Sequence, residues 1–223
     1  MTELLFSNIK DFKKCMQTIT EDNGLLSKRN YSLHKKFNNL DYNKFNNYNS
    51  IELIGKSNSN DNLYCFMYFV NNTSFLSKSY KTTSSNNINK IEEEIKKLYN
   101  LNKDIEVNLI IILTQLMKIN NYILKKKIIE KINIDNIQIF TYNNLLFNIT
   151  QHSRVPQHIR VIRDTAEINE LCELRNITNI NKLAKIQMTD PLANFYGLRV
   201  GELFEFKKFN RNAGTYIYYR VCI

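Results

Sequence analysis

The chain has 223 residues and a formal net charge of +10, from 31 Lys and Arg against 21 Asp and Glu. This length suffices for one or two domains, and the positive charge favours a nucleic acid or an acidic protein as the partner. The longest apolar run, residues 109–113, is far too short to cross a membrane, so no membrane association is expected.

The first 147 residues alternate predicted helices and predicted strands. A helix over 3–22 follows from apolar residues at helical spacing, such as Phe12 and Met16, and Asn23-Gly24 is expected to end it. A weak helical pattern covers 28–50, and a polar loop is expected at 71–88. Further helices are predicted at 88–101 and 122–132, and strands at 63–70, 107–113 and 137–142. This alternation predicts an α/β domain.

The remaining residues predict a compact α+β module. Asp164 is expected to cap a helix over 165–174 that has Ile168, Leu171 and Leu174 on one face. Asp190-Pro191 is expected to begin a short helix that ends at Gly197. Extended segments are predicted at 157–163, 202–209 and 215–223, with a turn at 210–214 between the last two.

Cys15, Cys65, Cys172 and Cys222 are widely spaced, without a Cys-x-x-Cys pair that would indicate zinc. Because no secretory signal is recognisable, reduced thiols in a cytosolic or nuclear setting are expected. Cys172 lies near the apolar face of its predicted helix, so a core position is favoured over a nucleophilic role.

Three blocks near the C-terminus are rich in turn-forming residues, which indicates a tightly specified backbone. Both prolines and three of the five glycines lie there. The first block, 148–158, reads Asn-Ile-Thr-Gln-His-Ser-Arg-Val-Pro-Gln-His. The second, 186–201, contains Asp-Pro-Leu-Ala and ends on Gly-Leu-Arg-Val-Gly. The third, 214–220, reads Gly-Thr-Tyr-Ile-Tyr-Tyr-Arg.

These blocks, in this order, resemble the small subunit shared by eukaryotic RNA polymerases I, II and III, the fifth in size ranking, which also has an archaeal counterpart. The resemblance implies an α/β N-terminal jaw domain, residues 1–147, and a small α+β C-terminal assembly domain, residues 148–223. It implies a non-catalytic subunit of a DNA-directed RNA polymerase that has no cofactor and no catalytic or metal site. The implied partners are the largest polymerase subunit, other polymerase subunits and the downstream duplex DNA.

The resemblance also implies site residues. Those expected to dock on polymerase subunits are His152, Val155, Pro156, His158, Asp190, Pro191, Gly197, Gly201, Gly214, Tyr216, Tyr219 and Arg220. Those expected near DNA, beside the jaw loop, are Lys118, Lys125, Lys126 and Lys127. The alternative for this lysine cluster is a solvated helix face.

The chain departs from the family pattern at its surface. In the hairpin turn, Asn210-Arg211-Asn212 stands where the family has Ser-Glu-Thr, and in the jaw loop Ile119-Asn120-Asn121 stands for Thr-Pro-Ser. The N-terminal domain agrees with the family only in its order of elements. These changes affect partner contacts more than the fold.

Other functions compete with that of a polymerase subunit. A free-standing basic nucleic-acid-binding protein fits the charge. A nuclease would need convergent carboxylates, and the best local pattern, Glu94-Ile95-Lys96, lies in a regularly charged predicted helix. His152 and His158 lack further metal ligands at suitable spacing, so an interface role is favoured. The abundance of Asn, Ile, Lys and Tyr fits both AT-rich protists and large DNA viruses. The divergent jaw favours a giant virus, in which case the protein is expected in the host cytoplasm and in the virion. A cellular subunit would be nuclear.

Overall fold

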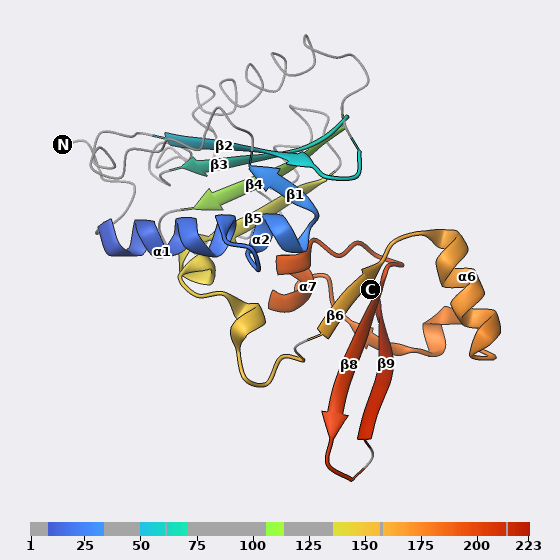
Figure 1. Ribbon diagram of the computed structural model, residues 1–223. Coiled ribbons are helices and arrows are strands. Elements are labelled where there is room, and N and C mark those ends of the chain that lie inside the picture. Colours follow the sequence, from blue (N-terminus) through green and yellow to red (C-terminus); the bar gives the residue numbers. More distant parts are fainter. Residues whose placement is uncertain are drawn as a thin grey trace, which may run out of the picture. The chain divides into compact units, whose positions relative to one another are not determined.

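The computed structural model describes residues 9–33, 50–60, 62–70, 106–113, 136–156, 158–212 and 214–223. The chain divides into two compact units, residues 1–147 and 148–223, and each unit has its own sheet (Figure 1). The prediction of a mixed α/β protein in two parts is confirmed at that level. No helix within these described ranges is long and apolar enough to cross a membrane.

The first unit contains a five-stranded sheet in the order β1-β2-β3-β4-β5. The strands are β1 (Tyr31–Leu33), β2 (Ser50–Ser57), β3 (Leu63–Val70), β4 (Glu106–Leu113) and β5 (Ile137–Thr141). The first three pair antiparallel, whereas β3 with β4 and β4 with β5 pair parallel. The mixed pairing agrees with the composition of β4, whose residues 109–113 are all buried, as expected for a strand covered on both faces.

Two helices complete the described part of this unit. From α1 (Ile9–Thr20), Phe12, Met16 and Ile19 are buried, which confirms the predicted apolar stripe. Helix α2 (Leu25–Lys28) buries Leu26 over Gly55 of β2, where an added Cβ would come within 2.8 Å of the Leu26 side chain. Gly55 therefore allows helix and strand to approach closely.

Two local predictions for this unit were wrong, and one strand was missed. Gly24 does not end α1, which stops at Thr20: its φ is −81°, and it is the N-cap of α2. Glycine is required there because an added Cβ would lie 2.6 Å from the carbonyl oxygen of Thr18. The helical pattern over 28–50 contains strand β1, and β2 was not predicted. The predicted loop at 71–88 and helices at 88–101 and 122–132 lie outside the described residues.

The second unit contains a four-stranded sheet in the order β6-β8-β9-β7. Its long hairpin is formed by β8 (Leu203–Asn210) and β9 (Gly214–Cys222) (Figure 1). Strand β6 (His158–Ile162) pairs antiparallel with β8, and β7 (Ala184–Ile186) pairs parallel with β9. The predicted extended segments and hairpin are confirmed, but β7 was not predicted.

Each face of this sheet has its own apolar packing. On one face, Ile162, Leu203 and Val221 form a core with Ile168 of α6 (Thr165–Leu174). On the other face, Tyr196 of α7 (Pro191–Tyr196) packs edge-on against Phe204, with ring centroids 5.2 Å apart. The hairpin is thus held between the two helices near its base.

Helix α6 begins where the sequence predicted, since the Asp164 side chain accepts a hydrogen bond from the Ala166 amide at 3.0 Å. Its predicted apolar face was partly wrong. Leu174 is 74% exposed, because six residues of helix rotate it about 120° away from Ile168. Cys172, four residues after Ile168, packs against the core instead, as predicted for this cysteine.

Candidate docking surface of the C-terminal unit

The second sequence block forms a capped helical turn. Asp190 Oδ1 accepts a hydrogen bond from the Leu192 amide at 2.8 Å, and Pro191 occupies the first helical turn. Gly197 ends the helix in the left-handed region with φ 66° and ψ 38°, and the Leu198 amide donates to the Ala193 carbonyl at 2.9 Å. The predicted helix start and stop are therefore confirmed.

Two further glycines specify backbone conformation. Gly201 has φ +89° and Gly214 has φ +67°, and an added Cβ would meet no heavy atom within 4 Å at either position. The requirement is therefore for the positive φ itself and not for a close approach of atoms. Among the predicted docking residues, Asp190, Pro191 and these glycines have a demonstrable role in shaping the surface.

The first sequence block forms a turn that leads into β6. The buried Asn148 side chain accepts hydrogen bonds from the amide of Thr150 at 3.0 Å and from its hydroxyl at 2.7 Å, an Asx-type turn that the sequence analysis missed. His152 and His158 are exposed, and His152 Nδ1 accepts from the Arg154 amide at 3.2 Å. The described part of the chain contains no group of three His, Cys, Asp or Glu side chains able to hold a metal ion.

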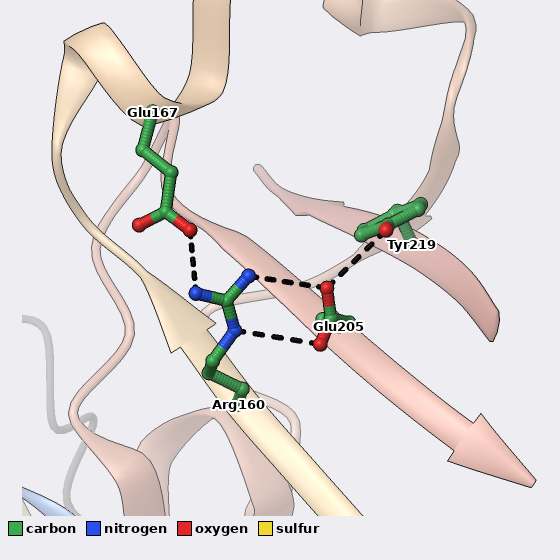
Figure 2. A network of polar contacts seen from close by, with 4 residues as sticks. All are labelled: Arg160, Glu167, Glu205 and Tyr219. Carbon is green, nitrogen blue, oxygen red and sulfur yellow. Dashed lines mark hydrogen bonds and ion pairs between the residues drawn. The ribbon is translucent and has the colours of Figure 1, made fainter. Parts of the chain in front are cut away.

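A polar network joins four elements, three strands and α6, on the α6-covered face of the sheet (Figure 2). Arg160 of β6 forms two hydrogen bonds with Glu205 of β8, at 3.4 Å from Nε and 3.2 Å from Nη2, and it also pairs with Glu167 of α6. Tyr219 of β9 donates its hydroxyl hydrogen to Glu205 at 3.2 Å. One carboxylate thus receives hydrogen bonds from both neighbouring strands.

Charge and burial in this network shift two pKa values. Hydrogen bonds to Glu205 and then to Glu167 raise the pKa of the Arg160 guanidinium. Burial, followed by the charge of Glu205, raises the pKa of Tyr219. The Arg160 side chain is 53% exposed and that of Glu205 only 20%, so the Glu205 end of the network is better shielded from water. Exposed ion pairs of this kind contribute about 0–1 kcal/mol each.

Aromatic rings follow the opposite face of the hairpin toward its turn. Tyr218 stacks on Phe206 at 4.9 Å between ring centroids, and Tyr216 stacks on Tyr218 at 5.9 Å. The Arg220 guanidinium lies over the Phe206 ring at 6.0 Å, within the range of a cation–π contact. Phe206 is buried, whereas Tyr216 is 37% exposed, so the row begins in the core and ends at the surface.

A shallow groove of about 740 Å³ brings the first block beside the hairpin turn. Val155, Pro156 and His158 line one part of it, and Phe209 and Thr215 line another. Lys207, Lys208 and Arg154 also line the groove, so it is both basic and partly apolar.

The structure therefore divides the predicted docking residues into two sets. One set is wholly or partly accessible at the surface: His152, Val155, Pro156, His158, Tyr216 and Arg220. Three of these residues, Val155, Pro156 and His158, lie together in the groove. Asp190, Pro191, Gly197, Gly201 and Gly214 shape the backbone, and Tyr219 takes part in the polar network. Their contact with a partner stays a prediction. The predicted DNA-proximal lysines at 118 and 125–127, and the Glu94-Ile95-Lys96 pattern, lie outside the described residues.

The four cysteines are free thiols, and the environment of three of them opposes ionisation. Burial raises the pKa of Cys15 and of Cys65 to about 12. Burial and then Glu202 raise the pKa of Cys222. These three thiols are therefore protonated near neutral pH and unsuited to nucleophilic chemistry.

Comparisons with known proteins agree with this geometry. Residues 147–222 match the family model described as RNA polymerase Rpb5, C-terminal domain, which covers nearly all of the second unit. The chain is 34% identical over 134 residues to "DNA-directed RNA polymerases I, II, and III subunit rpabc1" of Dictyostelium discoideum. These aligned residues are 58% of this chain and 64% of that protein. The chain is 32% identical over 88 residues to the subunit RPABC1 of Caenorhabditis briggsae, covering 39% of this chain and 40% of that protein.

The matched segments thus span less than two thirds of either relative. The relatives are named as subunits shared by three RNA polymerases, the family to which the three sequence blocks pointed. The C-terminal unit of this chain is therefore an Rpb5-like domain.

Proposed function

We propose that this chain is a non-catalytic subunit of a multisubunit DNA-directed RNA polymerase. The observation that carries the proposal is the match of residues 147–222 to the Rpb5 C-terminal domain, together with the capped turn and hairpin that the three blocks form. The two relatives bear the names of polymerase subunits. Nucleotide addition would be performed by other subunits of the complex.

In this proposal the C-terminal unit docks on the largest polymerase subunit. The accessible residues around the basic, partly apolar groove support it, because His158, Phe209 and Thr215 there combine apolar area with hydrogen-bonding groups. Interfaces of subunits commonly combine an apolar centre with a polar rim. The changed hairpin turn, with Arg211 between two asparagines, would suit a partner surface that is locally acidic.

The N-terminal unit would form a jaw beside the downstream duplex. The net charge of +10 supports this role, because lysines and arginines that contact phosphates hold DNA without reading its sequence. Lys118 and Lys125 to Lys127 would be the contacts. A cellular subunit would act in the nucleus; a subunit from a large DNA virus, which the divergent N-terminal sequence favours, would act in the host cytoplasm and enter the virion.

Affinity purification of the tagged full-length chain from its source tests the proposal. The lysate is treated with nuclease, so that partners bridged by DNA or RNA are lost. We expect the two largest polymerase subunits to remain bound. Recovery of the chain alone after nuclease treatment would favour the alternative, a free-standing basic nucleic-acid-binding protein.

A further inference from the structure

Among the residues that the structure describes, one edge of the second sheet is open along much of β9. Strand β8 pairs with β9 from Gly214 to Val221, but β7 pairs only with the segment from Arg220 to Cys222. Within the described residues, the stretch 214–219 therefore has a neighbouring strand on one side only. Figure 1 shows the β8–β9 hairpin extending as a long arm away from α6 and α7.

The main-chain groups of alternate β9 residues point toward this open edge. The Cys222 amide donates to the Glu202 carbonyl, on the β8 side, at 2.9 Å. The next residue, Ile223, donates to Ile186 at 2.9 Å, on the β7 side. Since this direction alternates along a strand, the N–H and C=O groups of Thr215 and Ile217 point away from β8 toward the open edge.

Apolar side chains flank the same edge. Ile217 is 43% exposed and Phe209, opposite Thr215, is 70% exposed, both on the α6-covered face of the sheet. Tyr216, on the other face, is 37% exposed. Edge strands are usually protected against pairing by short length or by charges along the edge. This edge instead offers hydrogen-bonding groups between accessible apolar side chains.

Charge distinguishes between possible occupants of the edge. Residues 206–223 include Lys207, Lys208, Arg211 and Arg220 but no Asp or Glu. The last carboxylate before them, Glu205, is already paired with Arg160. Edge-to-edge pairing with a second copy of this chain would bring two such basic hairpins together, which like charges oppose. An acidic strand would be attracted instead.

We propose that the open edge of β9, at Thr215 and Ile217, accepts an extended acidic segment of a partner protein as an added strand. Main-chain hydrogen bonds supply affinity in such strand addition, and alternate side chains supply specificity. Apolar residues of the segment would lie beside Ile217 on the same face, and its carboxylates would be attracted to the positive charge of the hairpin. The inference goes beyond the polymerase assignment, since it would hold for any partner that presents such a segment.

Amide hydrogen exchange of the full-length chain, followed by NMR, tests the proposal. The probe is a synthetic peptide of about ten residues that alternates Val and Glu. We expect it to slow exchange at Thr215 and Ile217 about tenfold or more, with little change at Tyr216 and Tyr218, whose amides already face β8. Equal slowing at all four amides, or none, would overturn the proposal.

Two variants at one position separate the backbone contribution from that of the side chain. Ile217→Pro removes the outward N–H, a change that an edge strand tolerates, whereas Ile217→Ala keeps it. We expect the proline variant to bind the peptide about tenfold more weakly than the alanine variant, the scale of one lost hydrogen bond. Equal affinities would contradict strand addition. If the proline variant fails to fold, the exchange pattern of the native chain still decides.

Two further probes test the partner class. A peptide that alternates Val and Lys should not bind, because its charge matches that of the hairpin. If an oligothymidylate slowed the Thr215 and Ile217 amides and the acidic peptide did not, the surface would be one for single-stranded nucleic acid and the proposal would fail. Sedimentation that showed dimers abolished by Ile217→Pro would likewise replace the acidic segment with a second copy of the chain.

Discussion

The left-handed residue at the end of α7 offers a sharp test of the local backbone account. In Gly197→Val, a β-branched side chain must adopt φ 66° and ψ 38°. This conformation costs L-residues about 1–2 kcal/mol and bulky ones more, so we expect the free energy of unfolding to fall by about 1–3 kcal/mol. The alternative, a shift of the turn, would break the hydrogen bond from the Leu198 amide to Ala193 and expose the buried Leu198.

The free energy of unfolding is measured by urea denaturation of the full-length chain, and amide hydrogen exchange at residues of the second unit reports the stability of that unit. Gly197→Asn is the matched control, because asparagine adopts left-handed φ more readily than valine. We expect the Asn variant to retain most of the stability that the Val variant loses. Equal stability of wild type and Gly197→Val would refute the claim that this position requires a positive φ.

Three further changes have defined outcomes. Burial raises the pKa of Tyr196 to about 12. The stability that its protonated form contributes is therefore present below the normal tyrosine pKa and is lost between about pH 10 and about pH 12. Tyr196→Phe should flatten this alkaline decline of the free energy of unfolding, and an unchanged pH profile would contradict the expectation. Arg160→Met should lower the free energy of unfolding by about 0–1 kcal/mol, and a double-mutant cycle with Glu205→Gln measures how much of this loss is coupling between Arg160 and Glu205. A loss of several kcal/mol would mean that the network is far less solvated than its exposure indicates. Neutral replacements of Lys118, Lys125, Lys126 and Lys127 should shorten the lifetime of stalled elongation complexes most at low salt, because fewer counterions are released from phosphates. Identical lifetimes of variant and wild type across a salt series would mean that these lysines do not face DNA.

Local signals in the sequence were sufficient for the second unit wherever one residue determines the backbone. Asp164 and Asp190 cap helices, and Gly197 ends one, as their chemistry predicts. The long strands β8 and β9 also followed from the alternation of residues and from the turn between them. In each case the interaction lies within a few residues of the signal.

Elements that depend on distant partners were harder to predict. Strand β7 has only three residues and exists through its parallel pairing with Arg220–Cys222, far along the sequence. Strand β1 is equally short and depends on β2. Gly24 was also misread, since it begins α2 and its Cα lies close to the Thr18 carbonyl, whereas the sequence suggested that it ends α1.

The candidate surface was predictable in its residues but not in its arrangement. The three blocks identified Pro156, His158 and Tyr216 as candidates, but not the groove that joins the first block to Phe209 and Lys208. Nor could sequence reveal the open edge of β9, because it results from the shortness of β7. The polar network of Arg160, Glu205 and Tyr219 was also missed, since its members come from three separate strands.

The central claim, that this chain is a polymerase subunit, is tested most directly by its stoichiometry in the enzyme. A tag on the second-largest polymerase subunit of the source allows the complex to be purified without selecting for this chain. Quantitative mass spectrometry then gives the molar ratio of this chain to the largest subunit. We predict a ratio near one-to-one that persists after nuclease treatment and high salt, and the absence of the chain from an active, intact polymerase would contradict the account.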